Sequence, residues 1–344
     1  MKRVDLMSKR VTIYEIANDL NLSPGTISKV INNTGSVSEK TRKQVLEYID
    51  EVGYVPSASA RILKSKRTYI IGVIFSEDLN IGLEHPFFSS ILQHFKNYAE
   101  DRGYELNFIV RKLGKNKMSY YEWCLNKRVD GVYIVVGNYQ DNEILEVVNS
   151  NIPCVSNDFI IKNLHTVISD NRSGVELVLD YIEKKLKLKK IAMISGPKTS
   201  KAFKERTEVF EENYKKYNLE KTSAIYADGF GFTSGYNATL KVLENKVKPE
   251  IIFCCSDDLA LGVLKALNDK NINVPNDIQV IGYDDISMAK HFTPPLTTIR
   301  QDRKRLGEKA AHDLIENIEN RESNKEEIIR IPVELVVRET TLEK

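Results

Sequence analysis

Residues 11–32 read VTIYEIANDLNLSPGTISKVIN and predict two short helices joined by a tight turn. Thr12 suits the cap of the first helix because Glu15, three residues later, can reach back to the cap backbone. Ser23 can cap the second helix, whose first position is Pro24, where a missing N–H costs nothing. Apolar residues recur at helical spacing and give each helix one buried face: Ile13, Ile16, Ala17, Leu20, Ile27, Val30 and Ile31. The stretch therefore predicts a helix-turn-helix.

The outward side of the second predicted helix carries small and polar residues. Such a side can approach base edges and phosphates closely, and Lys29 is long enough to reach either. A helix of this kind fits the major groove of DNA. An ordinary helical hairpin has similar caps and spacing, so the motif alone leaves that alternative open. The DNA contacts predicted in these two helices are Thr12, Tyr14, Ser23, Pro24, Gly25, Thr26, Ser28, Lys29 and Asn32.

A third helix and the distribution of charge favour the DNA-binding interpretation. Ser38 is a cap signal and Gly53 a stop signal, so three short helices complete a compact module. Ser38 and Thr41 are predicted as further DNA contacts. Residues 1–67 hold 12 Lys or Arg against 7 Asp or Glu, a net charge of +5, whereas the whole chain carries +2. The asymmetry localises a nucleic-acid surface to the N-terminal end.

Length and composition predict a large second domain. The chain has 344 residues and 42% hydrophobic content, enough for a substantial core beyond the helical module. No stretch has the apolar length of a membrane span, and the first ten residues lack the apolar core of a signal peptide, so a cytoplasmic protein is expected. Met1 and Met7 both remain possible starts. The four cysteines have no metal-ligand spacing, which favours reduced, buried thiols and no bound metal or cofactor.

From Tyr69 onward, short apolar runs alternate with helical stretches, a pattern typical of parallel sheets covered on both faces. There are too many such runs for one small sheet. The predicted strands are residues 69–75, 105–110, 130–136, 152–158, 190–196, 223–228, 250–257 and 277–284.

The N-terminal segment resembles the DNA-binding headpiece of the LacI/GalR (lactose-repressor) family of bacterial transcription regulators. Its matching stretches are VTIYEIA, TISKVIN, VSEKTRKQV and GYVPSASARIL. Further matches are VISDNRSG (167–174), SDDLALGVLKAL (256–267), VIGYDD (280–285), PPLTTIRQD (294–302) and VELVVRET (333–340), so the resemblance covers nearly the whole chain.

The resemblance implies an all-α headpiece with a hinge helix at residues 1–67. An α/β domain of two Rossmann-like lobes, similar to periplasmic binding proteins, then occupies residues 68–344. The N-lobe is expected at about 68–169 and 303–327, and the C-lobe at about 170–302 and 328–344. In the family the hinge helix orders when two subunits meet on DNA, and its leucine wedges into the minor groove. The DNA contacts that this adds are Tyr54, Ser57, Ala60 and Leu63.

An effector site is expected in the crevice beyond the carboxyl ends of the strands. Asp158, Asp257 and Asp284 end three predicted strands, whereas their neighbours Asp258 and Asp285 are better explained by capping or packing. The resemblance assigns effector contacts to these three aspartates and to Arg206 and Gln301, with an aromatic that stacks on the ligand. Carboxylates and a guanidinium suit vicinal hydroxyls. The full predicted set is Phe87, Phe88, Asp158, Arg206, Phe230, Asp257, Asp284 and Gln301.

The expected function is that of a homodimeric repressor of sugar-utilisation genes, released from a pseudo-palindromic operator by a small carbohydrate. One alternative keeps the DNA-binding regulator but makes the co-effector a nucleobase or a protein. A remote alternative is a sugar-active enzyme that uses Asp257 and Asp284 as a glycosidase pair. The sequence leaves open which molecule is the effector and whether it acts as an inducer or a co-repressor. It also leaves open the operator sequence and whether the protein is a dimer or a tetramer.

Overall fold

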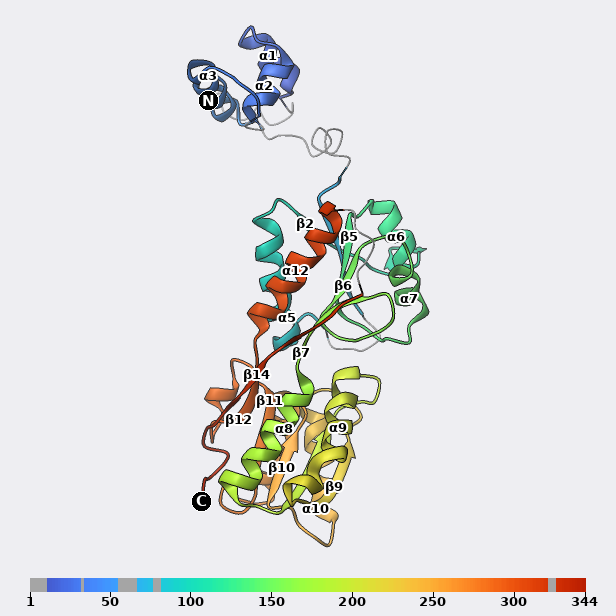
Figure 1. The fold of residues 1–344 in the computed structure, drawn as a ribbon, viewed down its shortest axis with the longest axis vertical. Coiled ribbons are helices and arrows are strands. Elements are labelled where there is room, and N and C mark those ends of the chain that lie inside the picture. Colours follow the sequence, from blue (N-terminus) through green and yellow to red (C-terminus); the bar gives the residue numbers. More distant parts are fainter. Residues whose placement is uncertain (1–10, 32–33, 55–66, 77–81, 321–325) are drawn as a thin grey trace. The chain divides into compact units, whose positions relative to one another are not determined.

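The computed structural model describes residues 11–31, 34–54, 67–76, 82–320 and 326–344 (Figure 1). The chain divides into two compact units, residues 1–68 and 69–344. We call the first the headpiece and the second the two-lobed domain. The predicted hinge helix, with Ser57, Ala60 and Leu63, lies outside the described residues, as does Asn32.

The headpiece contains the three expected helices: α1 (Ile13–Asp19), α2 (Pro24–Ile31) and α3 (Glu39–Val52). Thr12 and Glu15 form the predicted capping box. Gly53 ends α3 with a φ of 61°, the left-handed conformation that glycine adopts without strain. The core is small, and its fully or nearly fully buried members are Ile16, Ala17, Ile27, Val30 and Val45.

The N-lobe is a six-stranded, fully parallel sheet in the order β13-β7-β6-β5-β1-β2. One face packs against α5 (Pro86–Glu100) and α12 (Arg303–Asn320), and the other against α6 (Tyr120–Lys127) and α7 (Asn142–Val148) (Figure 1). The strands are β1 (Ile70–Phe75), β2 (Glu105–Phe108), β5 (Gly131–Val136), β6 (Cys154–Ser156), β7 (His165–Ser169) and β13 (Ile328–Ile331); a small hairpin, β3 (Lys112–Leu113) with β4 (Asn116–Lys117), lies apart.

The C-lobe repeats this three-layer arrangement with the order β14-β12-β11-β10-β8-β9, in which only β14 is antiparallel. Helices α8 (Asn171–Tyr181) and α9 (Lys201–Asn213) cover one face, while α10 (Phe232–Glu244) and α11 (Asp257–Asp269) cover the other. The remaining elements are β8 (Lys190–Ser195), β9 (Glu220–Tyr226), β10 (Ile251–Cys254), β11 (Gln279–Asp284), β12 (Thr297–Gln301), β14 (Val333–Val336) and the short helices η3 (Ile182–Leu186), η4 (Tyr214–Tyr217) and η5 (Ala289–His291). The expected fold class is confirmed.

The chain crosses between the lobes three times: after β7, after β12 and between β13 and β14. The expected third boundary, at residue 328, was wrong by a few residues. Ile328–Ile331 pairs with β7 and belongs to the N-lobe sheet, so the crossing falls at Pro332. Proline suits this position because it cannot continue a ladder on either side.

All eight predicted strands form, but β7, β12, β13 and β14 lie in segments that the apolar pattern did not select. β7 begins with a histidine, which interrupts an apolar run. His165 is nevertheless buried, because its Nε2 lies 2.8 Å from the carboxylate of Asp313 on α12. The pair ties the helix to the sheet. Among the described residues, no helix is long and apolar enough to cross a membrane.

The pair His165–Asp313 predicts a specific pH dependence of stability. Burial opposes ionisation of Asp313, but hydrogen bonds from His165, Lys309 and His312 prevail and lower its pKa to about 2. A carboxyl group whose pKa is lower in the folded than in the unfolded state stabilises the folded protein at pH values above the unfolded pKa. This stabilisation is lost as pH falls from about 4 to about 2. The full contribution is about 2 kcal/mol, and about half should be gone at pH 3.

Denaturant unfolding of the wild type and of Asp313→Asn at pH 6 and pH 3 measures this contribution. The difference in unfolding free energy between the two proteins should shrink by about 1 kcal/mol at the lower pH. A difference that does not change with pH would show that the pair has no such role.

Candidate functional site

The headpiece presents the predicted DNA contacts on its surface. Tyr14 is 72% exposed. Thr12, Ser23, Pro24, Gly25, Lys29 and Ser38 are also exposed, whereas Thr26, Ser28, Thr41 and Tyr54 are half-buried. A Cβ at Gly25 would meet nothing nearer than the Ser23 hydroxyl at 3.6 Å, so packing within the headpiece does not require glycine there.

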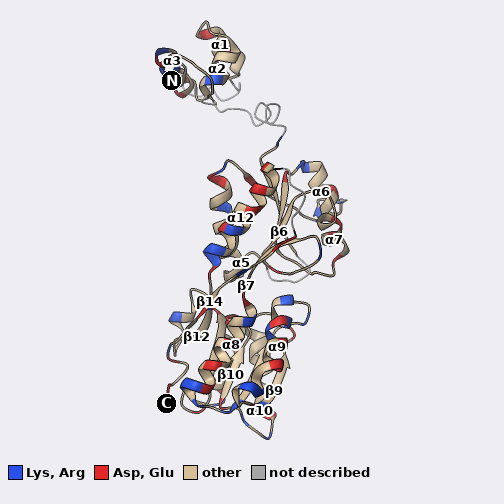
Figure 2. Ribbon diagram, viewed as in Figure 1, with Lys and Arg blue, Asp and Glu red and all other residues tan. Residues whose placement is uncertain are grey.

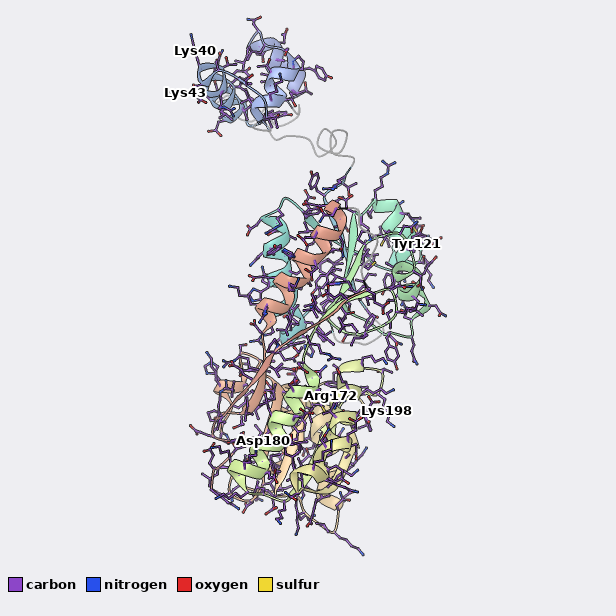
Figure 3. The ribbon with its side chains drawn as sticks, in the orientation of Figure 1. Lys40, Lys43, Tyr121, Arg172, Asp180 and Lys198 are labelled. Atoms are coloured by element: carbon purple, nitrogen blue, oxygen red, sulfur yellow. The ribbon has the colours of Figure 1, made fainter. Side chains whose placement is uncertain are left out.

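Charge within the described part of the headpiece is segregated rather than uniformly basic. Residues 11–31 and 34–54 hold four Lys or Arg against six Asp or Glu, so the positive excess predicted for residues 1–67 comes from the segments outside them. The basic residues are Lys29 on α2 and Lys40, Arg42 and Lys43 in the first half of α3 (Figures 2 and 3). Three of the acids lie at the end of α3. Phosphate contacts therefore fit α2 and the start of α3.

The two-lobed domain contains a pocket between its lobes. Its cavity volume is about 50 Å³. Seven of the eight predicted effector residues line it: Phe87, Phe88, Asp158, Arg206, Phe230, Asp284 and Gln301. They come from both lobes, so a ligand bound here touches both sheets.

The eighth residue, Asp257, does not line the pocket, and its assignment as an effector contact was wrong. It is fully buried, and its carboxylate accepts hydrogen bonds from Thr298 Oγ1 at 2.6 Å and from the N–H of Ile286 at 2.9 Å. Ser256, not an aspartate, caps α11. Asp257 therefore fastens the start of α11 to the sheet. A glycosidase pair with Asp284 is excluded, because this carboxylate faces no substrate.

Arg206 is held firmly in the pocket wall and is 4% exposed. Its Nε donates to Asn171 Oδ1 at 2.8 Å, its Nη1 donates to the carbonyl of Cys255 at 2.6 Å, and its guanidinium lies 3.6 Å from the centre of the Tyr283 ring. A guanidinium fixed from three sides presents its remaining N–H groups in a defined plane.

Two carboxyl groups share this one arginine. Burial raises the pKa of Asp284 to about 7, although Arg206, whose Nη1 lies 3.9 Å from it, acts in the opposite direction. Burial also raises the pKa of Asp158 to about 7, against the N–H of Gly137, which donates to it at 3.0 Å. Each group can therefore donate or accept a hydrogen bond near neutral pH. Asp284 also has a φ of 125°, a strained backbone conformation of the kind found at binding sites.

Aromatic rings form much of the remaining wall. Phe87 and Phe88 pack edge to face with their ring centres 5.2 Å apart, and the ring centres of Phe203 and Phe230 are 5.6 Å apart. Phe87 is only 9% exposed and belongs to the N-lobe core, whereas Phe88 is partly buried against that core. At the rim, His85 of the N-lobe lies 3.5 Å from Asp258 of the C-lobe. The other strand-end acid, Asp285, pairs with Arg300 and Arg338 instead of a ligand.

Sequence reasoning missed several lining residues. The most informative are His85, Asn171, Ser200, Phe203 and Ser256. Ser200 and Ser256 are the N-caps of α9 and α11. The sequence around each serine indicates only the start of a helix and does not indicate a pocket. Among the described residues, no group of three or more His, Cys, Asp or Glu is placed to hold a metal ion.

Family models match both units of the chain. Residues 12–57 match "Bacterial regulatory proteins, lacI family", and residues 184–341 match "Periplasmic binding protein-like domain". The chain is 34% identical to the HTH-type transcriptional repressor PurR of Pasteurella multocida and 32% identical to that of Vibrio vulnificus. Each alignment covers 96% of this chain and 98% of the relative.

Solved structures give the same result. A structure of the Lac repressor dimer bound to operator and the anti-inducer ONPF is similar over 97% of this chain and 100% of that chain, with 27% identity and a TM-score of 0.81. The transcriptional regulator CelR in complex with cellobiose is similar over 96% of this chain and 100% of that chain, with 26% identity and a TM-score of 0.69. The fold, the helix-turn-helix headpiece and the similar proteins all indicate a DNA-binding transcriptional repressor and not an enzyme. The chain belongs to the LacI family of bacterial regulatory proteins.

Proposed function

We propose that this repressor acts as a homodimer whose affinity for a pseudo-palindromic operator is set by a purine nucleobase bound between the lobes. The operator and the dimer follow from the similarity to the Lac repressor dimer bound to operator. Two-fold symmetry places the half-sites about one helical turn, or a multiple of it, apart. Because the effector touches both lobes, its binding energy can favour one lobe arrangement, which the dimer transmits to the headpieces.

The observation that carries the choice of ligand is that the three amide side chains lining the pocket are already hydrogen-bonded within the protein. Gln301 donates to Asp284 at 2.5 Å, and Asn157 donates to the carbonyl of Val167 at 2.5 Å. Asn171 is occupied by Arg206 and Glu205. A sugar needs partners around its whole ring, whereas a flat base needs aromatic faces and a polar edge. The phenylalanines supply the faces, while Arg206, Asp158 and Asp284 supply the edge.

Two further points favour a purine over the carbohydrate expected from the sequence. The exclusion of Asp257 leaves the pocket less acidic than that expectation assumed. The relatives that are 32–34% identical over nearly the whole chain are named PurR. A carbohydrate remains the second candidate, supported by the cellobiose complex of CelR.

A thermal-shift screen followed by operator titration tests the proposal. Guanine, hypoxanthine, xanthine and adenine are compared with ribose, glucose and cellobiose, each far above its expected Kd. A ligand at about 100 times its Kd stabilises the folded state by about 2.7 kcal/mol, which should raise the Tm by several degrees. We expect a purine to do so and to change the operator Kd. Stabilisation by sugars alone would replace the purine with the second candidate, and a purine that leaves the operator Kd unchanged would contradict the proposed linkage.

A further inference from the structure

The polar contacts of Arg206 continue beyond the pocket. Arg206 Nε donates to Asn171 Oδ1 at 2.8 Å, and the amide nitrogen of Asn171 donates to Glu205 Oε2 at 2.8 Å. The other oxygen of Glu205, Oε1, lies 3.0 Å from Nη2 of Arg330. Both carboxylate oxygens of Glu205 are therefore engaged, one toward the pocket and one away from it.

This series of contacts joins the two lobes. Arg206 and Glu205 lie on α9 and Asn171 begins α8, all in the C-lobe, whereas Arg330 lies on β13 of the N-lobe sheet, opposite Ile168 of β7. The chain leaves β13 for the C-lobe only two residues later, at Pro332. The N–H of Asp170, on the first crossing, donates to the carbonyl of Ile331 at 2.8 Å. The ion pair thus sits where two of the three crossings lie side by side.

We infer that Glu205 and Arg330 are positioning residues for the effector site, acting through Asn171 to fix the guanidinium of Arg206 and to make its position depend on the relation between the lobes. Asn171 can accept from Arg206 only while its amide is oriented this way, and Glu205 fixes that orientation by accepting from the amide nitrogen. Arg330 in turn holds the carboxylate of Glu205. A movement of β13 relative to α9 therefore changes the position of the group that binds the effector.

A purely stabilising role explains these contacts poorly. The side chains of Arg330 and Glu205 are 37% and 26% exposed, and ion pairs with this exposure to solvent contribute little to stability. Asn171 and Arg206, by contrast, are each 4% exposed, so their geometry is strongly constrained. The ion pair therefore fits a role in orienting the buried side chains of Asn171 and Arg206 better than a role in stabilising the fold.

The chain offers a matched control in the same region. Arg172 is the neighbour of Asn171 on α8 and is labelled in Figure 3. Its Nη2 lies 3.2 Å from Oε2 of Glu212 on α9. Both residues belong to the C-lobe and are about half exposed, at 52% and 56%. They make a similar ion pair between α8 and α9, both of its members belong to one lobe, and neither is among the residues that line the pocket.

The experiment is a double-mutant cycle on the full-length protein with Glu205→Gln, Arg330→Met and the double variant, and the parallel cycle with Glu212→Gln and Arg172→Met. Effector Kd is measured with the purine that stabilises the wild type, and operator Kd without effector. We expect Arg330→Met and Glu205→Gln each to weaken effector binding by about 5- to 20-fold, non-additively, and to leave operator Kd unchanged. Arg330→Lys should recover part of the loss. The Arg172 cycle should leave effector Kd unchanged.

A ligand-free measurement keeps this test independent of the proposed effector. The Nε–H of Arg206, assigned in NMR spectra by its loss in Arg206→Lys, should exchange slowly in the wild type and at least about fivefold faster in Arg330→Met. Unchanged exchange and an unchanged or additive effect on effector Kd would overturn the inference, as would equal effects from the Arg172 cycle. If no purine binds the wild type, the proposed function fails, and the exchange rate alone decides the role of the pair.

Discussion

Ile16→Asp should abolish operator binding while the two-lobed domain remains folded and still binds its effector. Ile16 is fully buried at the centre of a five-residue core. An unpaired carboxylate there costs several kcal/mol, whereas so small a module has only about 3–5 kcal/mol of stability. The unfolded headpiece keeps only non-specific attraction to DNA, so operator affinity should fall by more than about 100-fold.

Asn18→Asp is the matched control, because it adds the same charge to the exposed side of the same helix. Operator Kd by fluorescence anisotropy, together with the Tm of the two-lobed domain and the effector-induced shift in that Tm, separates the outcomes. The control should lose far less operator affinity. Operator binding by Ile16→Asp at the wild-type level would show that the helix-turn-helix does not carry recognition, and loss of the effector-induced shift would show that the two units do not fold separately.

Arg206→Met should remove effector binding, with a loss of at least about 100-fold, and leave operator binding of the effector-free protein intact. Among the described residues that line the pocket, the guanidinium is the only positive charge apart from His85 when protonated. Its removal leaves the carboxyl groups of Asp158 and Asp284 without their cation. Breaking such a buried arrangement costs about 3–5 kcal/mol, and the pKa of both carboxyl groups should rise further because the positive charge that acts against burial is gone.

Arg300→Met is the control for the loss of an arginine from the same lobe. Arg300 lies on β12 and pairs with Asp285 and Glu334 outside the pocket. Calorimetric titration with the ligand found in the screen should show near wild-type affinity for this variant and none for Arg206→Met. The Tm without ligand shows whether either variant has lost its fold. Normal effector binding by a folded Arg206→Met would place the effector site elsewhere.

Local signals predicted the headpiece well, because helix caps are bonds between residues three apart. The Thr12–Glu15 capping box, the Ser38 cap and the left-handed Gly53 all form as the sequence indicated. Strand ends were predicted for a similar reason, since a polar residue after a buried run marks the edge of a parallel sheet. This rule placed Asp158 and Asp284 at the pocket.

The same rule failed for Asp257, and the reason is tertiary. Its partners, Thr298 on β12 and the N–H of Ile286 just after β11, lie 41 and 29 residues away in the sequence and reach it only in the folded lobe. Tertiary packing also explains why Asn171, Phe203 and Ser256 line the pocket. They lie at the starts of helices, which pack against the ends of strands only in the folded lobe.

The sequence alone determined the helix-turn-helix, the alternation of strands and helices, and the edge of each sheet where the pocket lies, since each depends on residues close together in the chain. The tertiary structure decided which polar side chains face the pocket, which are occupied by one another, and where β13 passes from one lobe to the other. Those outcomes depend on contacts between distant segments, such as Arg330 with Glu205 and His165 with Asp313, whose partners no local pattern specifies. Burial, which raises the pKa of Asp284 and fixes Arg206, exists only after these segments have packed.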